Sequence, residues 1–306
     1  MKKCFASLLF ILCFNLSYSL SHPLADTTIY EIESYQDGLD LMKELNYTRE
    51  SWEAGIREVP SLFIMQISDK WRSKTTHEIS VKLKKQIFFR VLAPLALYSN
   101  EIIMEERTKL KALIKKGPDW SKSDSNWLLA LAKDYKVSAN SKEDLTAYVL
   151  SELLMRVDII PVSLALSQSV EESGWGTSRF AAEGNALFGQ WAWGKDAMKP
   201  KEQRSGMGDY GLAKFDTPVE SMMAYMHNLN THNAYKDLRS QRAEMRNNGG
   251  EPRGYELTNS LIKYSERGQA YVNTLQSIMR VNHLQQTDEA YLNHDQVILM
   301  VSVDDN

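Results

Sequence analysis

Residues 161–180 read PVSLALSQSVEESGWGTSRF, and this stretch decides the fold. Its first half is apolar on nearly every face, which indicates a helix buried inside a domain. Four of its residues recur at spacings of three and four positions and therefore share one helix face: Val162, Ala165, Ser169 and Glu172. Glu172 thus continues a core-facing stripe and is expected at the inner edge of the domain, while Glu171 lies about a hundred degrees around the helix.

The position of Glu172 suits acid catalysis. A carboxyl group against apolar walls has a raised pKa, which a general acid requires near neutral pH. The glycines on either side of Trp175 predict a tight turn that places an indole beside the acid. A structural role is the alternative: Glu172 caps the helix or pairs with Arg179, because buried ion pairs also perturb pKa values. The pattern alone leaves both interpretations open.

The N-terminus has the three parts of a secretory signal peptide. A Lys-Lys pair supplies the positive charge, residues 5–14 form the apolar segment, and residues 17–19 (SYS) offer a cleavage site between small residues. Residues 19–21 (SLS) are the alternative site. The apolar segment is too short to span a membrane. We therefore predict a signal peptide over residues 1–19 and an exported, periplasmic product without stable membrane insertion.

Charge and cysteine content exclude several kinds of site. Cys4 and Cys13 both lie in the signal peptide, so the mature chain has no disulfide, thiolate zinc site or cysteine nucleophile. The formal charge of −3 becomes −5 when the two signal lysines are removed, which argues against nucleic acid as a partner. His227 and His232 lie five residues apart, the wrong spacing for two metal ligands on one helix face. We expect these histidines to pack or to line a cleft, and we predict no metal and no cofactor.

Apolar periodicity predicts a largely helical chain with one glycine-rich interruption. Helices are expected over residues 81–100, with a kink or break at Pro94, and over 101–115, 127–135, 144–156, 161–172, 218–230, 257–264 and 269–282. The apolar stretch 88–97 is expected to be a buried helix rather than a membrane contact. The glycine-rich residues 174–211 predict loops and short strands, residues 116–119 predict a domain boundary, and residues 297–303 predict one edge strand. The pattern is that of a mainly α, α+β protein.

Two short motifs carry a resemblance to a known family. Residues 172–176 (ESGWG), followed by residues 185–189 (NALFG), resemble the signature of bacterial glucosaminidase domains, which belong to glycoside hydrolase family seventy-three and have a lysozyme-like fold. Further stretches in the same order resemble the Bax-type proteins of that group: residues 88–95, 100–101, 160–191, 213–216, 227–232 and 261–268. Together with the helical pattern, the resemblance implies three parts after the signal peptide: an N-terminal helical region over 20–120, a lysozyme-like glucosaminidase domain with a small Gly-rich β lobe over 121–284, and a tail over 285–306.

The resemblance implies an enzyme that acts on the glycan strands of peptidoglycan, an endo-β-N-acetylglucosaminidase that cleaves the β-1,4 bond following N-acetylglucosamine. Carried over by position, Glu172 matches the family's general acid, and Tyr264 matches a tyrosine that lines the cleft and supports the reacting centre. Asn185 and Phe188 match the loop that floors the substrate groove. Ala186 departs from the family pattern, in which a second asparagine is commoner, and this departure bears on substrate contacts.

A second carboxylate is the usual partner of the acid in glycosidases. The resemblance places it in the glycine-rich lobe, where Asp196, Glu202 and Asp209 are the candidates and Glu202 is preferred. The acetamido group of the substrate and a distant base are the alternatives. Inversion, retention and substrate assistance therefore all stay open.

Aromatic and acidic neighbours complete the predicted site. Trp175 and Trp191 are expected to contact the substrate, and Trp191 and Trp193 alternate as on a strand, which suits stacking on sugars or packing within the lobe. Glu171 is unusual for the family. It either raises the pKa of Glu172 by like-charge repulsion or faces solvent.

Two other functions fit parts of the pattern. A muramidase or lytic transglycosylase shares the lysozyme-like fold and a Glu-Ser motif, but the Gly-Trp-Gly sequence after Ser173 favours a glucosaminidase. A non-catalytic cell-wall-binding adaptor would use the N-terminal helical region as its interaction module, and an intact Glu172 and Tyr264 argue against it. Fold alone does not separate these functions.

Overall fold

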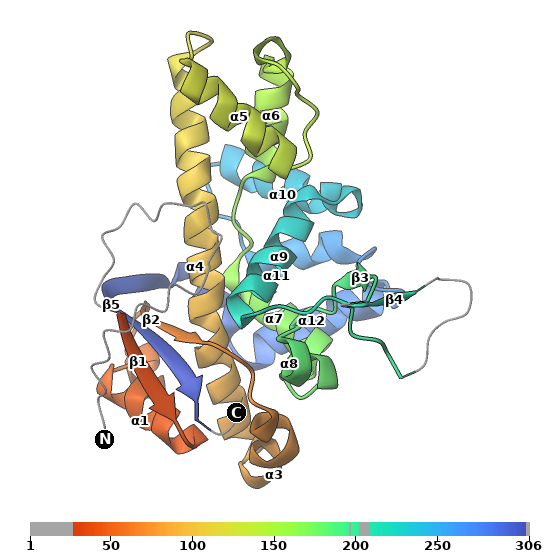
Figure 1. Cartoon of the computed structure of the whole chain (residues 1–306). Helices are drawn as coiled ribbons and strands as arrows, with labels where there is room; N and C mark the ends of the chain where they lie inside the picture. The colour runs from red at the N-terminus through yellow and green to blue at the C-terminus, as the bar shows by residue number, and fades with distance from the viewer. Residues whose placement is uncertain (1–26, 196, 202–208, 304–306) are drawn as a thin grey trace.

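The computed structural model describes residues 27–195, 197–201 and 209–303, and Figure 1 shows one long helix with the other elements arranged around it. The predicted signal peptide and the preferred second carboxylate, Glu202, lie outside these residues. The described chain is mainly helical, with a three-stranded sheet and a two-stranded hairpin, as expected for a mainly α, α+β protein.

The described elements are, in chain order, β1 (Thr27–Ile32), α1 (Tyr35–Glu44), α2 (Arg49–Glu53), β2 (Glu58–Ile64), η1 (Trp71–Thr75), α3 (Thr76–Glu78), α4 (Val81–Lys116), α5 (Lys122–Asp134), η2 (Lys142–Asp144), α6 (Ala147–Arg156), α7 (Val162–Ser173), α8 (Arg179–Gly184), β3 (Trp191–Trp193), β4 (Tyr210–Leu212), α9 (Pro218–Thr231), η3 (Asn233–Tyr235), α10 (Lys236–Asn247), α11 (Gly254–Leu257), η4 (Thr258–Leu261), α12 (Gln269–Val281), η5 (Leu284–Glu289) and β5 (Tyr291–Ser302). The η elements are short 3-10 turns, apart from the π-helical η1.

Helix α4 is the longest described element and runs along most of the molecule (Figure 1). The hydroxyl of Ser80 accepts a hydrogen bond from the backbone N–H of Leu83 at its start, and Gly117 ends it with a φ of 80°. The prediction of two helices that meet at residue 100 is wrong, because one helix continues through that point, and the helix is not interrupted at Pro94. Proline costs a helix a backbone hydrogen bond and a steric contact. Residues 92–97 around it are all buried, and this packing outweighs that cost.

The apolar character of α4 reflects burial inside the protein. Among the residues that the structure describes, α4 is the one helix long and apolar enough to cross a membrane, and 61% of its most apolar window is buried within the molecule. It packs on β2 and β5 of the larger sheet and on helices α7 and α9. The buried-helix prediction for residues 88–97 therefore agrees with the structure. The predicted domain boundary falls at the Gly117 turn, while the helix before it shares one core with α7 and α9.

The three strands of the larger sheet are parallel and lie in the order β1-β5-β2. The last strand is the centre of this sheet, so the prediction of an edge strand near the C-terminus is wrong. The region before residue 120 was expected to be helical, but it contributes β1 and β2. Ser61 of β2 donates a side-chain hydrogen bond to the carbonyl of Asn293, 232 residues away. Pairing over such a separation depends on tertiary packing and leaves no local pattern in the sequence.

Helix α7 lies at the centre of the molecule and is buried from Val162 to Val170. Its first residues are capped by a side chain from η5 near the end of the chain. Asp288 accepts hydrogen bonds from the backbone N–H of Ser163 at 2.8 Å, the hydroxyl of Ser163 at 2.9 Å and the backbone N–H of Gly254 at 2.9 Å. A Cβ atom at Gly254 would lie 2.1 Å from the Ser163 hydroxyl oxygen, so only glycine fits there. The predicted tail, residues 285–306, therefore helps to hold the start of α7 in place through Asp288.

Helix α10 was not predicted, because its buried face is made largely of arginine. Leu238, Arg239 and Arg242 are its buried residues. Arg242 donates to the backbone carbonyls of Asp158 and Ile159 in the connection between α6 and α7. A pattern of apolar residues cannot reveal a face that is buried through charged side chains.

A buried cluster of charges holds that connection in place. Asp158 is 2% exposed and bonds to the guanidinium of Arg246 at 2.6 and 2.8 Å, with Arg107 at 3.4 Å. Burial by itself raises the pKa of Asp158. The hydrogen bond from Arg246 and the charges of Arg242, Arg107 and Arg246 outweigh burial and lower this pKa below its ordinary value. This carboxylate is thus a structural anchor in its charged form.

The other predicted helices are present with shifted ends, except the one expected over residues 257–264. There α11 ends at Leu257 and the 3-10 turn η4 follows over Thr258–Leu261, so this prediction of one helix is wrong. The Ser141–Asp144 capping box forms, but it caps the short η2 turn, and α6 begins at Ala147 with Thr146 as its own cap. The glycine-rich segment contains the antiparallel hairpin of β3 and β4, as expected, together with the unpredicted helix α8. In Figure 1 this hairpin projects from the helical body on the side away from the larger sheet.

Candidate active site

Glu172 lies in the last turn of α7, which ends at Gly174 in the left-handed conformation with a φ of 59°. Its side chain is half-buried, and the Tyr271 hydroxyl donates a hydrogen bond to its Oε1 at 2.7 Å. Burial raises the pKa of Glu172, and the charge of Glu171 raises it further, while the bond from Tyr271 and the charge of Arg267 act in the opposite direction. The net pKa is raised, as the sequence predicted for this position.

The ion pairs near Glu172 differ from the pair with Arg179 that the sequence left open. Arg179 pairs with Glu183 at 2.8 Å and donates to the backbone carbonyl of Lys199, so it is not the partner of Glu172. Glu171 forms an ion pair with Arg267, which also donates to the Thr274 hydroxyl. Glu171 therefore does more than face solvent, because it fixes the loop before α12 to the end of α7.

Four tyrosines surround the acid, and they come from α9, η3, the loop before α12 and α12: Tyr225, Tyr235, Tyr264 and Tyr271. The predicted Tyr264 stacks on Tyr271, with ring centroids 5.3 Å apart and planes 6° from parallel. The hydroxyl that bonds Glu172 belongs to Tyr271, which the sequence analysis missed. Burial, followed by the charge of Glu172, raises the pKa of Tyr264 well above its ordinary value, so its phenol stays neutral.

A hydrogen-bond chain runs behind the acid through the fully buried Gln168. The Tyr225 hydroxyl donates to Gln168 Oε1 at 2.6 Å, and Gln168 Nε2 donates to the Tyr271 hydroxyl at 2.9 Å. Gln168 and Tyr225 were not predicted either. Two signals were available: Gln168 precedes Glu172 by four residues and so lies on the same face of α7, and Tyr271 lies on the buried face of the amphipathic α12.

Two residues predicted to line the substrate groove, Phe188 and Asn185, are buried and contact other parts of the protein. Phe188 is 3% exposed and stacks on Tyr225, with ring centroids 3.8 Å apart. Asn185 is 8% exposed and ends α8 with a φ of 52°. Its amide accepts from the backbone N–H of Ile67 and donates to the carbonyls of Phe215 and Asp216. The polar atoms of Asn185 are therefore committed to joining three segments of the protein.

Trp175 packs against α4. Its ring contacts Phe88 and Phe89 edge-on, at 5.5 and 5.3 Å between centroids, and Lys85 lies over it. Its backbone carbonyl accepts a hydrogen bond from the indole N–H of Trp71. The expectation was an indole directed to the acid and the substrate. In the structure, this indole packs on α4 and so attaches the turn after α7 to the long helix.

The hairpin exposes an aromatic surface. Trp191 is 45% exposed and Trp193 is 68% exposed, so neither ring is buried in a core, although Trp191 also packs within the lobe. Tyr210 stacks on Trp191 at 5.0 Å between centroids, with the two ring planes 24° apart. Asp209, one of the candidate second carboxylates, forms an ion pair with Lys199 at 2.5 Å. The other two candidates, Asp196 and Glu202, lie outside the described residues.

Comparison with known proteins places this site in a family. The family model for Glucosaminidase, described as mannosyl-glycoprotein endo-beta-N-acetylglucosaminidase, matches residues 148–284. Protein bax of Escherichia coli (strain K12) is 34% identical over 201 residues, which cover 65% of this chain and 70% of that protein. The chain belongs to the Bax-type glucosaminidase-domain proteins. No solved structure matches significantly.

Membership in the Bax-type group makes this a glycoside-hydrolase type of enzyme with a cell-wall glycan as the implied substrate. The matched segment runs from α6 to the first residue of η5 and contains Glu172, Gln168 and the four tyrosines. The lysozyme-like glucosaminidase domain is thus supported on one side by α4, and Asp288 and β5 follow the matched segment.

Within the described residues, neither a metal-binding cluster nor the groove between α10 and the α11–η4 segment coincides with this centre. Among residues 27–195, 197–201 and 209–303, no group of three or more His, Cys, Asp or Glu side chains is placed to hold a metal ion. His227 contacts the backbone carbonyl of Asp134 at 3.1 Å, and its ring packs on Tyr135.

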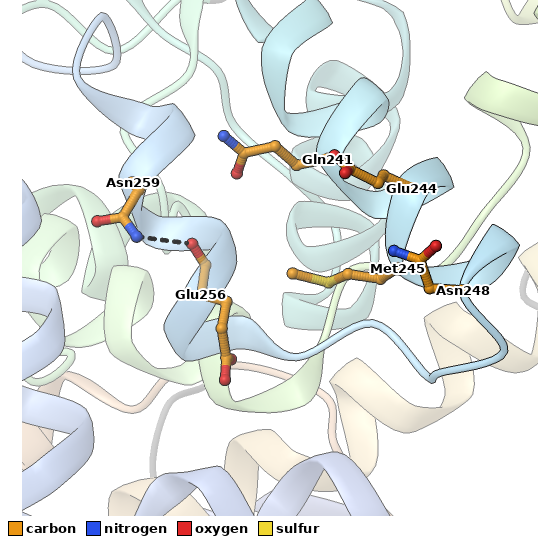
Figure 2. Close-up of a pocket in the computed structure, with 6 residues that line it drawn as sticks. All are labelled: Gln241, Glu244, Met245, Asn248, Glu256 and Asn259. Atoms are coloured by element: carbon orange, nitrogen blue, oxygen red, sulfur yellow. Dashed lines mark hydrogen bonds between the residues drawn. The ribbon is translucent and has the colours of Figure 1, made fainter.

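A groove of about 400 Å³ lies between α10 and the α11–η4 segment and is shown in Figure 2. It is lined by Gln241, Glu244, Met245, Asn248, Glu256 and Asn259. Neither Glu172 nor the tyrosines line it, so this groove is separate from the candidate active site of the Bax-type domain.

Proposed function

We propose that the mature chain is an exported peptidoglycan hydrolase that cleaves the β-1,4 bond following N-acetylglucosamine, with Glu172 as its general acid. One observation carries this proposal: a half-buried carboxyl with a raised pKa ends the central helix of a glucosaminidase domain, and it is bonded by a neutral, buried tyrosine. The export component rests on the signal-like N-terminus of the sequence.

The chemistry follows from the two states of Glu172. Because its pKa is raised, more of the carboxyl stays protonated near neutral pH than for an exposed glutamate. The protonated carboxyl donates to the glycosidic oxygen as the bond from that oxygen to the sugar C1 breaks. The resulting carboxylate keeps the Tyr271 hydroxyl as a donor at 2.7 Å, and this bond strengthens as negative charge develops.

Sugar rings are expected to be held by the hairpin. Trp191 and Trp193 present exposed faces next to each other, 6.3 Å apart between centroids, which suits stacking on successive pyranose rings. Three of the predicted groove residues are expected to support the site rather than contact the substrate. Asn185 positions the loop after α8, Phe188 positions Tyr225, and Trp175 positions the turn after α7. We keep Glu202 as the candidate for the second carboxylate.

The reaction is tested by its products. Purified peptidoglycan is digested with the mature protein, the new ends are reduced, and the reducing-end sugar is identified by mass spectrometry, with Glu172→Gln in parallel. Reduced N-acetylglucosamine that disappears with the variant supports the proposal. Reduced N-acetylmuramic acid or anhydro ends would move the protein to the muramidase or transglycosylase class. Absence of cleavage over a range of pH would favour a wall-binding adaptor.

Export is tested separately by fractionation. A tagged full-length chain is expected in the periplasmic fraction with a mass reduced by the predicted signal peptide. A chain of unchanged mass in the cytosol would contradict the export component and leave the chemical proposal to be judged by the digestion experiment.

A further inference from the structure

The hydrogen-bond chain behind Glu172 has a direction. It passes from the Tyr225 hydroxyl to Gln168 Oε1, from Gln168 Nε2 to the Tyr271 hydroxyl, and from that hydroxyl to Glu172 Oε1. A tyrosine hydroxyl has a single proton to donate. Tyr271 can therefore donate to Glu172 only while Gln168 presents its amide nitrogen, rather than its carbonyl oxygen, to Tyr271.

The buried surroundings favour this direction over the reverse. Gln168 is fully buried, and Tyr225 and Tyr271 are each 1% exposed. If the amide of Gln168 were turned over, Gln168 Nε2 would donate a hydrogen bond to the Tyr225 oxygen. The hydroxyl proton of Tyr225 would then have no acceptor among the described hydrogen bonds. A buried donor without a partner is costly. Tyr225 thus sets the orientation of the amide, and Gln168 transmits it to Tyr271.

We propose that Gln168 is a positioning residue that fixes the direction of the hydrogen bond from Tyr271 to Glu172 Oε1 and so leaves the acid proton on Oε2. The proposal rests on the role of Glu172 as general acid. With the chain intact, Oε1 is an acceptor and Oε2 carries the proton that goes to the glycosidic oxygen. Without the chain, the Tyr271 hydroxyl is free to accept a hydrogen bond from a protonated Oε1, and the acid proton then points into the protein and away from the substrate.

The groups facing Glu172 allow the effect to be measured by pH. They are Glu171 on α7, Arg267 and Tyr264 in the loop before α12, Tyr271 on α12, Tyr225 on α9 and Tyr235 in η3. Glu171 and Arg267 form an ion pair, and their effects on the pKa of Glu172 oppose each other. Burial raises the pKa of each tyrosine, so these phenols stay neutral. Among these groups, the carboxyl whose pKa is raised is that of Glu172, so the pH dependence of cleavage is expected to report on it.

Two substitutions remove groups that fix the direction of the hydrogen bond from Tyr271 and leave Glu172 itself unchanged. Gln168→Leu removes both links, and Tyr225→Phe keeps the ring stacked on Phe188 but removes the hydroxyl that orients the amide. Both are expected to lower kcat about tenfold with KM within about twofold, because a directed donor to the developing charge is lost. The alkaline limb of the kcat profile should move up by about one pH unit, since the carboxylate loses an enforced donor.

A conservative substitution and a matched control separate positioning from folding. In Gln168→Glu, a neutral carboxyl accepts from Tyr225 through its carbonyl and donates to Tyr271 through its hydroxyl, so activity should return at acidic pH and fall as pH rises. Ser167→Ala alters a neighbouring, equally buried α7 residue whose hydroxyl bonds only the carbonyl of Leu164 in the described contacts. Its pH profile should be that of the wild type.

The decisive readout does not depend on the substrate. The Glu172 carboxyl is titrated by carbon-13 NMR in full mature protein labelled at the glutamate side-chain carboxyl and assigned with Glu172→Gln. A higher pKa of Glu172 in Gln168→Leu and Tyr225→Phe, with no change in Ser167→Ala, supports the inference. Folded variants with a wild-type titration and a wild-type pH profile would overturn it. If the wild type cleaves no peptidoglycan, the proposed reaction is wrong. The titration of Glu172 still decides whether Gln168 fixes the direction of the hydrogen bond from Tyr271.

Discussion

The two ends of helix α7 each meet a carboxyl group, and the pair shows how one physical effect serves two purposes. Asp288 lies at the first turn and Glu172 in the last, both are partly buried, and burial raises the pKa of both. Asp288 accepts three hydrogen bonds, which use both of its oxygens. The described hydrogen bond to Glu172 uses Oε1, and Oε2 is left for chemistry.

The difference shows that a raised pKa by itself does not identify a catalytic acid. The two groups differ in the hydrogen bonds that they accept. Asp288 joins Ser163 of α7 to Gly254 of α11, whereas the described bond to Glu172 comes from Tyr271 alone. The buried Asp158 gives a third case, because its arginine partners lower its pKa in spite of burial.

The largest expected effect is on cleavage. Glu172→Gln keeps the shape of the side chain but has no acidic proton, so peptidoglycan cleavage should fall by about a thousandfold, within the range typical of a lost general acid. Asp288→Asn is the matched control at the other end of α7 and should retain activity per folded molecule. Release of soluble sugar ends measures both. An active Glu172→Gln, or a folded but inactive Asp288→Asn, would break the comparison.

The second effect is on stability. Asp288→Ala leaves the backbone N–H groups of Ser163 and Gly254 without their acceptor, so the free energy of unfolding should fall by about 1–3 kcal/mol. Urea denaturation followed by circular dichroism gives this value. Glu289→Ala is the control, since Glu289 is exposed and contacts Arg57 only at 4.0 Å. Equal stability of the two variants would show that the cap does not stabilise α7.

The third effect concerns the hairpin. Trp191→Ala and Trp193→Ala should each weaken binding to glycan strands by up to roughly tenfold, because an aromatic face contributes about 0.5–1.5 kcal/mol. Binding is measured by co-sedimentation with insoluble peptidoglycan in the Glu172→Gln background. Tyr148→Ala serves as control, because Tyr148 is an aromatic residue on α6 that is more exposed than either tryptophan. The same loss in all three variants would remove the hairpin from the binding surface.

The smallest effect is the pH dependence of stability. The pKa of Glu172 is raised in the folded state, so its contribution is fully present below its ordinary value of 4.5 and is lost as pH rises through the folded pKa. Glu172→Gln does not titrate. Its free energy of unfolding relative to wild type should therefore increase between pH 4 and pH 7, by less than about 1 kcal/mol. Urea titrations at both pH values test this, and a decrease over that interval would mean that the sign of the pKa shift is wrong.

The sequence predicted what depends on residues within a few positions of one another. The apolar stretch of residues 161–170 specifies a buried α7, and the same pattern places Glu172 at its edge with a raised pKa. The glycines of residues 174–211 predict loops and a short hairpin, and the family motifs identify the Bax-type domain. Helix periodicity, caps and turns are local, so they can be recognised without knowing the fold.

Only the tertiary structure decided which side chains surround the acid. Tyr271 is 99 residues from Glu172, and Asp288 is 125 residues from Ser163, so no spacing along the chain reveals either contact. Strand β5 becomes the centre of the larger sheet because β1 and β2, from the other end of the chain, pair with its two edges. Burial through Arg239 and Arg242 likewise concealed α10 from an apolar pattern. A carboxyl with a raised pKa can be predicted from one helix, but the direction of its hydrogen bonds is set by groups that only folding brings together.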